Sequence, residues 1–317
     1  MCVGKFIISV MDTRWVLTET EYVGADLTGL PKPIESILIS RGICSLANLE
    51  QFLTPPHELP YDPLRLSGMA EALRRIYLAS KQNQIVGVFG DFDVDGITGT
   101  SIIKEGLEDF GISVVTYIPD RVSEGHGLSE AAIHYFESQA VLLLITVDCG
   151  VTSTEEVSYA RQLGIDVIIT DHHVPGDSIP AALAIINSQL EGSSYPYPYL
   201  CGAGIAFKLI QGLYQFVGQP WPIKLLELAA LGTIADLVPL TDENRYIVSQ
   251  GLNGLANTER PGLLALYKHA NVNCSQLTSE TVSYQISPRL NSSGRMANAG
   301  ISLDLLTTDS YDEADKL

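Results

Sequence analysis

The chain has few basic residues, no closely spaced cysteine pair and no long apolar run, and each shortage argues against a class of protein. Lysine and arginine total 19 against 37 aspartates and glutamates, a net charge of −18. This balance argues against non-specific nucleic-acid binding through a broad basic surface, but it is compatible with a local basic groove. The five cysteines contain no Cys-x-x-Cys pair, which argues against a zinc ribbon or a dithiol redox motif. The sequence also lacks any run of about 18 apolar residues, so it predicts no transmembrane helix and no membrane partner.

What is present is typical of a globular protein. Hydrophobic residues make up 46% of the chain and charged residues 18%. A length of 317 residues predicts a sizeable core and two domains. Scattered cysteines, together with no recognisable secretory leader, predict a reducing, cytoplasmic location.

From residue 84 onward, apolar strands alternate with amphipathic helices, which indicates an α/β protein with a parallel sheet covered by helices on both faces. A mainly helical segment follows the sheet. The predicted strands are 85–89, 113–118, 141–147, 167–170 and 183–186. The predicted helices are 34–38, 45–53, 69–81, 98–110, 129–138, 154–163 (with Ser153 as N-cap), 202–216, 223–235, 244–255 and 262–269. The pattern divides the chain into an irregular and helical part, a sheet-containing part and a helical part, at 1–68, 69–256 and 257–317.

Asp91, Asp93 and Asp95 alternate with apolar residues just after the first predicted strand. In an extended strand the three carboxylates would face one way and repel each other, whereas a turn opening at Gly96 lets them spread around a cation. The EF-hand pattern is excluded because its twelfth position, which needs glutamate, is Ile102. The spacing therefore favours a site for a hard divalent cation, and a solvated acidic turn is the alternative.

Two more predicted strands end in potential ligands. Asp148 follows a strand too apolar for the surface, so its carboxylate is either a helix N-cap or a metal ligand. The next strand ends in Asp171, His172 and His173, where one imidazole can bind a metal, the other can face substrate, and the aspartate can orient a ring. The alternative is a helix cap followed by surface histidines. Asp236 ends an apolar helical run and needs a partner, either a metal or an arginine.

Two segments carry groups suited to phosphate. The first, 119–128, combines glycines with Arg121, which can bind phosphate as a fork, and with His126. The second, 287–295, carries Arg289, Asn291 and Arg295 with several hydroxyls, which suit contacts to a phosphate backbone. Either segment can instead be a structural loop.

Seven ordered segments together resemble the DHH phosphoesterase superfamily, and in particular the RecJ-type single-strand-specific exonucleases. They are GDFDVDG at 90–96, YIPDRVSEGHGLS at 117–129, TVDCGVTS at 146–153, DHH at 171–173, LCGAGIAFKL at 200–209, LGTIADLVPL at 231–240 and PRLNSSGRM at 288–296. The resemblance starts near Arg41 and runs to Met296. It implies that 69–256 is the DHH phosphoesterase domain and 257–317 a helical connector. Family members continue into a DHHA1 domain that this sequence does not contain, so the resemblance implies either that the chain is a fragment or that the remaining half is supplied elsewhere.

The resemblance implies a hydrolase, namely a metal-dependent 5′→3′ exonuclease that cleaves single-stranded DNA, with RNA left open, in DNA repair and recombination. It implies two Mn²⁺ or Mg²⁺ ions, with Asp148 as the bridging ligand and Asp91 in or beside the ligand shell. The other implied metal ligands are Asp93, Asp95, His172 and Asp236. Catalysis is assigned to Asp148, His172 and His173, the last facing the scissile phosphate. The nucleic-acid backbone or its 5′ end would be held by Arg121, His126, Arg289, Asn291 and Arg295. A single-strand-binding protein or a helicase is the expected partner.

Two other functions stay open at this point. One is a smaller-substrate member of the same superfamily, such as a nano-RNA or cyclic-dinucleotide phosphodiesterase or a pyrophosphatase. The other is a non-catalytic, Cdc45-like nucleic-acid-binding protein. The long N-terminal segment favours the exonuclease over the first, and the intact acidic and histidine residues argue against the second. The chain departs from the family at His126, where tyrosine is common, although imidazole can also stack on a base.

Overall fold

The computed structural model describes residues 9–10, 13–14, 27, 29–54, 58–296 and 298–317. Contacts divide the chain into two compact units, Met1–Pro55 and Pro56–Leu317. In the first unit the short strands β1 (Ser9–Val10) and β2 (Thr13–Arg14) pair antiparallel, and helices α1 (Lys32–Ser40) and α2 (Leu46–Leu53) follow. The hydroxyl of Ser45 accepts a hydrogen bond from the amide of Asn48 and so caps α2. The boundaries at 68/69 and 256/257 stay predictions.

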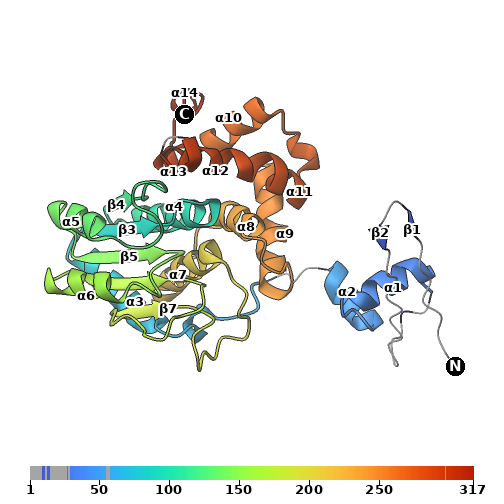
Figure 1. Cartoon of the computed structure of the whole chain (residues 1–317), viewed down its shortest axis with the longest axis horizontal. Coiled ribbons are helices and arrows are strands. Elements are labelled where there is room, and N and C mark those ends of the chain that lie inside the picture. Colours follow the sequence, from blue (N-terminus) through green and yellow to red (C-terminus); the bar gives the residue numbers. More distant parts are fainter. Residues whose placement is uncertain (1–8, 11–12, 15–26, 28, 55–57, 297) are drawn as a thin grey trace. The chain divides into compact units, whose positions relative to one another are not determined.

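A five-stranded sheet forms the centre of the second unit, and all of its strands are parallel (Figure 1). The strand order is β4-β3-β5-β6-β7. Every residue of β3 and β5 is buried, which is why these strands read as continuous apolar runs. The strands are β3 (Val86–Gly90), β4 (Val114–Tyr117), β5 (Leu143–Val147), β6 (Asp166–Thr170) and β7 (Ala184–Ile186). The predicted α/β class is confirmed.

Helices cover both faces of this sheet, as predicted. On one face Val86 and Ile145 share a core with α3 (Met69–Lys81), α4 (Val94–Asp109) and α7 (Gly202–Phe216). On the other face Phe89 and Leu144 pack with α5 (Glu130–Ser138) and α6 (Thr154–Gln162). Because side chains alternate along a strand, neighbouring residues of β3 and β5 supply the two cores.

The mainly helical segment that follows packs on α4, which contacts α7, α8 (Leu225–Ala235) and α13 (Gly300–Thr307). Residues 279–296 form one helical run in which a π-helix, η3, separates α11 from α12. Among the described residues, no helix combines the length and apolarity that crossing a membrane requires. The remaining elements are η1 (Pro63–Arg65), α8 (Leu225–Ala235), α9 (Asp242–Ala256), α10 (Pro261–Ala270), η2 (Cys274–Gln276), α11 (Ser279–Thr281), η3 (Val282–Ile286), α12 (Ser287–Met296), α13 (Gly300–Thr307) and α14 (Tyr311–Ala314).

Two local predictions differ from the structure. Helix α4 begins at Val94, four residues before the predicted start, because the Asp93 carboxylate accepts hydrogen bonds from the amides of Asp95 and Gly96 and caps it. The second segment predicted to bind phosphate, 287–295, is a helix and not a loop. Its serine hydroxyls bond back to carbonyls of the preceding turn, so its polar residues do not break the helix. Ser153 does occupy the N-cap of α6, but its side chain makes no capping bond.

A buried ion pair joins four segments of the second unit. Lys208 Nζ lies 2.9 Å from Glu243 Oε1, and both side chains are fully buried. The same ammonium donates to the carbonyl of Tyr61 at 2.7 Å, and the hydroxyl of Tyr195 donates to the second oxygen of Glu243 at 2.5 Å. This network connects the chain before α3, the loop before α7, α7 itself and α9.

Candidate metal centre

Polar residues follow four of the five strands at the carboxyl edge of the sheet. The parallel pairing continues one residue beyond the strands, because the amides of Asp91, Asp148 and Asp171 donate to carbonyls of the next strand along. These three aspartates therefore lie level with one another. The chain passes from β3 outward to β4 and then returns to β5 on the opposite side of β3. Asp91 and Asp148 thus lie at the topological switch point, where ligands bind in open α/β sheets.

Asp93 and Asp95 are fixed by helix ends. Asp93 uses one carboxylate oxygen to cap α4. Asp95, in the first turn of α4, accepts hydrogen bonds from the amides of Gly202 at 2.6 Å and Ala203 at 2.9 Å. Those amides form the N-terminus of α7, whose dipole favours a negative charge. A Cβ on Gly202 would lie 2.5 Å from that of Asp148, so glycine is required for this close approach.

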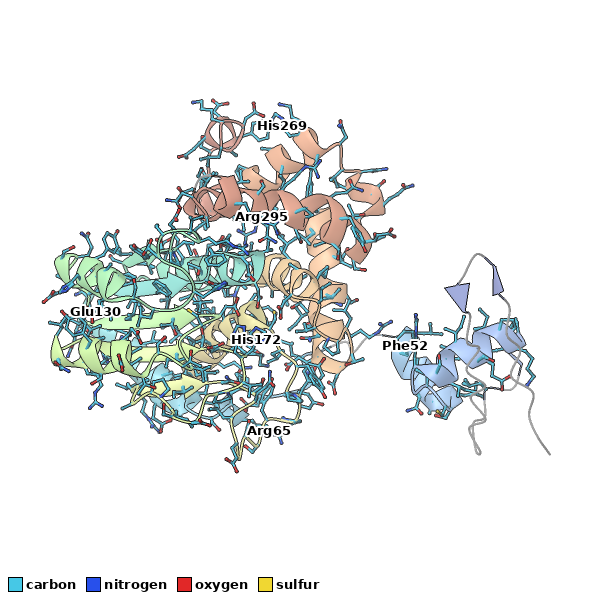
Figure 2. All side chains as sticks on the ribbon, viewed as in Figure 1. Phe52, Arg65, Glu130, His172, His269 and Arg295 are labelled. Carbon is cyan, nitrogen blue, oxygen red and sulfur yellow. The ribbon has the colours of Figure 1, made fainter. Side chains whose placement is uncertain are left out.

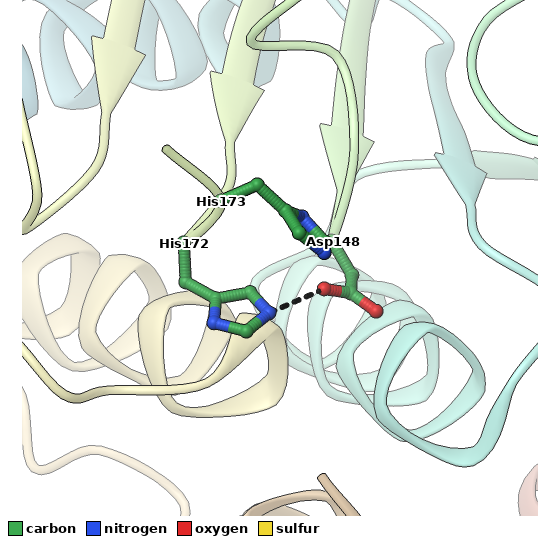
Figure 3. Close-up of side chains that lie close together, drawn as sticks. All are labelled: Asp148, His172 and His173. Carbon is green, nitrogen blue, oxygen red and sulfur yellow. Dashed lines mark ion pairs between the residues drawn. The ribbon is translucent and has the colours of Figure 1, made fainter. Parts of the chain in front are cut away.

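Asp148 is held in a conformation that few residues adopt. Its φ is 61°, in the left-handed region, and its side chain is buried. The carboxylate does not cap the following helix, which rules out one of the two roles that the sequence left open. Instead Oδ1 lies 3.1 Å from Nε2 of His172 (Figure 3). Backbone strain of this kind clusters at functional sites.

Asp171 organises the two histidines. Its Oδ1 accepts hydrogen bonds from the amides of His172 and His173 and from Nδ1 of His173, the last at 2.8 Å. Its Oδ2 accepts from the amide of Val151. The imidazoles diverge, with ring planes 49° apart, and His172 turns toward the carboxylates (Figure 3). The geometry fits the orienting role that the sequence suggested for Asp171.

Two residues that the sequence reasoning missed donate hydrogen bonds to the backbone carbonyls of the two histidines. Asn187 is fully buried and donates from Nδ2 to the carbonyl of His173 at 2.8 Å. Gln189 donates from Nε2 to the carbonyl of His172, and its own amide donates to Asn187 Oδ1. Asn187 follows β7 directly, so a polar residue at the end of that strand was the signal that could have revealed it.

The ligand atoms form three overlapping groups, within each of which all atoms lie within 4.8 Å of one another. The groups are Asp91, Asp93 and Asp148; Asp95, His172 and Asp236; and Asp148, His172 and His173. Nε2 of His172 is 3.8 Å from Asp95 and 3.7 Å from Asp236. All members of these groups except Asp95 line one cleft, which has a volume of about 460 Å³.

Two buried oxygens in this cleft, Oδ1 of Asp91 and Oδ1 of Asp148, accept no well-aligned hydrogen bond from the described residues. Among these residues, each has only an imidazole nitrogen nearby, Nδ1 of His126 at 3.4 Å from Asp91 and Nε2 of His172 at 3.1 Å from Asp148. Buried charged oxygens without a partner are costly, and a cation is the partner that a cluster of carboxylates with one imidazole suits. The donor set of carboxylate oxygens and a histidine nitrogen fits Mn²⁺ or Mg²⁺. The residues present therefore fit a divalent metal site.

The protonation equilibria reflect the same crowding. Burial raises the pKa of Asp91 and Asp95, and raises that of Asp148 well above its usual range, where repulsion from the other aspartates adds to the effect. Burial, with repulsion from Asp95 and Asp93, raises the pKa of Asp236 to about 7. Such shifts are typical of sites built to bind a cation or a proton.

Burial also lowers the pKa of His172 against the pull of the nearby carboxylates, which favours the neutral imidazole that a metal needs. The hydrogen bond that Nδ1 of His173 donates to Asp171 raises the pKa of His173. The pKa values of the two adjacent histidines are thus shifted in opposite directions. The shift favours a neutral imidazole, suited to bind a metal, at His172 and a protonated imidazole at His173.

The first segment predicted to bind phosphate, 119–128, forms one rim of the cleft through His126 and Gly127. Its loop is held by Asp120, whose Oδ1 accepts hydrogen bonds from the amides of Val122 and Ser123. The guanidinium of Arg121 lies 5.1 Å from the centre of the Phe92 ring, and the ring of His126 lies 4.3 Å from it. Nδ1 of His126 is also 3.4 Å from Asp91. Phe92, which the sequence reasoning did not single out, therefore packs against both Arg121 and His126 at this rim.

The structure separates the residues of the second segment. Asn291 Oδ1 accepts a hydrogen bond from the amide of Val94, so it supports the start of α4 directly behind the aspartates. Arg295 lines a neighbouring groove together with Asn291. Arg289 lies apart from both: it donates to the carbonyl of Gln285 and lines a different groove that contains His269.

Comparison with known proteins identifies this arrangement. Residues 85–233 match the family model described as DHH family, N-terminal domain. The single-stranded-DNA-specific exonuclease RecJ of Bacillus subtilis (strain 168) is 41% identical over 284 residues, which cover 90% of this chain and 36% of that protein. RecJ of Escherichia coli (strain K12) is 37% identical over 304 residues, which cover 92% of this chain and 52% of the relative. The chain thus spans about a third to a half of the length of these curated relatives.

A solved structure agrees with the sequence relatives. The crystal structure of exonuclease RecJ bound to manganese superposes with a TM-score of 0.74 at 35% identity, covering 81% of this chain and 65% of the other. The chain therefore belongs to the DHH family, and its relatives within that family are the RecJ exonucleases.

Proposed function

We propose that this chain carries the catalytic centre of a metal-dependent exonuclease that hydrolyses single-stranded DNA in the 5′→3′ direction. The observation that carries the proposal is the convergence of six candidate metal ligands, five of which line one cleft, where two buried carboxylate oxygens accept no hydrogen bond from a described residue. The relatives named single-stranded-DNA-specific exonuclease support the substrate. A cytoplasmic role in DNA repair and recombination, together with a single-strand-binding protein or a helicase, belongs to the same proposal.

The metal ligands in this proposal are Asp91, Asp93, Asp95, Asp148, His172 and Asp236. Asp148 belongs both to the group around Asp91 and to the group around His172, so it is the residue suited to bridge two cations. When bound, two Mn²⁺ or Mg²⁺ ions supply Lewis-acid stabilisation of phosphoryl oxygens and a water of lowered pKa. The six residues would hold the two cations in fixed positions before the substrate binds.

His173 is the candidate proton donor or phosphate ligand. Its raised pKa and its exposure, at the mouth of the cleft, suit a group that holds a proton for a developing oxyanion. Arg121 and His126 flank the ring of Phe92 at the rim, where a guanidinium and stacked rings suit the phosphate and base at the end of a single strand. This placement is the structural support for recognition of a 5′ end.

Release of mononucleotides from 5′-phosphorylated single-stranded DNA, with and without Mn²⁺, tests the proposal. Matched strands labelled at the 5′ or the 3′ end give the direction of degradation. We expect Mn²⁺-dependent release from the 5′ end and its loss in Asp148→Ala. Activity that survives this substitution would show that the site has been assigned to the wrong residues.

The alternative functions give different results. A phosphodiesterase for nano-RNA or cyclic dinucleotides would cleave a pApA-type dinucleotide far faster than a long DNA strand. A non-catalytic, Cdc45-like protein would show no tight Mn²⁺ binding by calorimetry. The intact ligand groups favour a metal-binding enzyme over this second alternative.

A further inference from the structure

The first turn of α4 is completed by a side chain from a distant helix. A helix leaves its first amides without partners in the helix itself, and here Oδ1 of Asp93 accepts from two of them, the amides of Asp95 and Gly96. The amide of Val94 donates instead to Oδ1 of Asn291, 197 residues further along the chain, at 3.0 Å. Val94 is buried, so water is a poor substitute for this acceptor.

A second contact joins the same two segments one helical turn later. Gly294 of α12 faces the carbonyl oxygen of Phe92, and a Cβ on Gly294 would lie 3.4 Å from that oxygen and 3.3 Å from Cβ of Ala299. Glycine is less favourable than alanine in a helix interior, and its use here lets α12 approach closely. Asn291 and Gly294 are three residues apart, so both lie on the helix face toward the acidic turn, residues 91–96.

The sequence of α12 (Ser287–Met296) forms a helix poorly by itself. Its serines, asparagine and glycine favour caps and turns over helix interiors, so contacts with other elements must hold it in place. The hydroxyl of Ser302 in α13 donates to the carbonyl of Leu290 and lies 2.8 Å from the hydroxyl of Ser293. Figure 2 shows Arg295 near the end of α12, on the side of the helical segment that faces the sheet. Contacts with α13 and with the acidic turn therefore hold α12.

The π-helix η3 sets which face of α12 meets the acidic turn. Pro288 has no amide hydrogen, so it cannot donate an α-helical bond to the carbonyl of Tyr284. The chain forms a wider turn instead, in which the amide of Ser287 donates to the carbonyl of Val282, five residues earlier. Because a π-turn holds one more residue than an α-turn, it changes the direction of every later side chain, including that of Asn291.

The position of the acidic turn matters because three candidate metal ligands lie on it. Asp91 and Asp93 belong to one ligand group and Asp95 to another. Like charges at this spacing repel, so an unsupported turn would spread its carboxylates apart. The contacts with α12 fix the backbone at Phe92 and at Val94, which alternate with those aspartates. Support of this kind brings the ligands together before a cation binds.

We infer that Asn291 is a positioning residue for the metal centre, and that docking of the helical run 279–296 and binding of a divalent cation stabilise each other. The family resemblance implies a nucleic-acid contact for Asn291, whereas its side-chain oxygen accepts from the amide of Val94. The inference rests on the proposed function, because the cation is the one proposed there. A coupling free energy is reciprocal, so the contact and the cation strengthen each other by the same factor.

Titration calorimetry of the whole chain with Mn²⁺ measures the effect of the contact on cation binding. Asn291→Leu removes the acceptor at similar size, so affinity should fall about 10- to 100-fold, as is typical when a group that orients metal ligands is lost. Asn291→Asp keeps an oxygen for the Val94 amide and should retain most of the affinity. Asn253→Leu, at an exposed asparagine of α9, is the matched control and should bind like the parent.

Circular dichroism checks that each variant is folded, and Asn291→Ala repeats the test with a smaller side chain if leucine does not fit. Unchanged Mn²⁺ affinity in the folded variant that lacks the acceptor overturns the inference. An equal loss in Asn291→Asp also overturns it, because the acceptor would then not be what matters. Absence of Mn²⁺ binding by the parent would refute the proposed function itself, whereas equal binding by the parent and Asn291→Leu refutes only the inference.

Hydrogen exchange followed by mass spectrometry measures the effect of the cation on docking. In the parent, Mn²⁺ should slow amide exchange in peptides that cover 279–296, and Asn291→Leu should lose this protection. Equal protection in both proteins would contradict the coupling. Binding of a labelled single strand in EDTA separates positioning from direct contact with the strand. Asn291→Leu should bind the strand like the parent there, and weaker binding would place Asn291 on the strand instead.

Discussion

Replacing Asp148 by asparagine should make the metal-free protein more stable while removing its response to metal. The substitution keeps the size of the side chain and a residue type that tolerates the left-handed φ of 61°. It removes a buried carboxylate that is crowded by other aspartates and whose Oδ1 accepts no well-aligned hydrogen bond from the described residues. An asparagine amide at that point would face Nε2 of His172, now 3.1 Å from the carboxylate oxygen.

The size of the effect follows from the cost of an unsatisfied buried group. Such a group costs about 1–3 kcal/mol, and more when it is charged. For a unit the size of Pro56–Leu317, each kcal/mol raises the midpoint of thermal unfolding by about 2–4 °C. In the parent, Mn²⁺ at 100 times its dissociation constant should add about 2.7 kcal/mol of stability, and most of this gain should be absent in Asp148→Asn.

Thermal unfolding followed by circular dichroism, in EDTA and in Mn²⁺, measures both effects. Asp177→Asn is the matched control, because this aspartate is exposed on the loop after the histidines. It should behave like the parent in both conditions. A lower unfolding temperature for Asp148→Asn in EDTA would refute the reasoning about the unsatisfied charge. A full Mn²⁺ response in that variant would refute the assignment of Asp148 as a ligand.

Three further predictions concern the surroundings of the site. Asn187→Leu frees the carbonyl of His173, so calorimetry should show Mn²⁺ affinity reduced by about 10- to 100-fold; an unchanged affinity would exclude a positioning role. In EDTA, the free energy of unfolding should fall as pH rises from about 4 through 7, by up to about 1.4 kcal/mol per pH unit. The reason is that the pKa of Asp236 in the folded state is raised to about 7, so the folded state binds more protons than the unfolded state in this pH range. Asp236→Asn should flatten that dependence in urea titrations. Glu243→Gln should cost about 3–5 kcal/mol by leaving Lys208 uncompensated, and the double variant with Lys208→Met should recover part of the loss; no recovery in chemical unfolding would contradict the ion-pair argument.

The order of strands and helices could be predicted because the physical signal is local. β3 and β5 are buried along their whole length, so they had to be apolar, and the alternating helices had to be amphipathic. The position of the candidate metal ligands followed from the same logic, since Asp91, Asp148 and His172 each come just after a strand. Parallel strands bring such residues to one edge whatever their distance along the chain.

Other features depend on contacts that no local pattern encodes. The sequence left Asp148 open as a helix cap, because only the fold shows that its carboxylate turns toward His172. The early start of α4 depends on the Asp93 carboxylate, which accepts hydrogen bonds from two amides within the motif itself. Arg289 and Arg295 are six residues apart and looked equivalent in the sequence, yet they line different grooves because the segment is helical.

The close packing at Gly202 and Gly232 limits which substitutions the protein can accept beside Asp148 and Asp95. A methyl group at Gly202 would lie 2.5 Å from Cβ of Asp148, and one at Gly232 would lie 2.7 Å from Oδ1 of Asp95. A library randomised at these two positions should therefore yield almost no metal-binding members, whereas one randomised at exposed rim positions such as Val122 should yield many. Attempts to alter the preference for one cation over another would accordingly begin at the rim, where exposed side chains such as Val122 can be replaced without steric conflict.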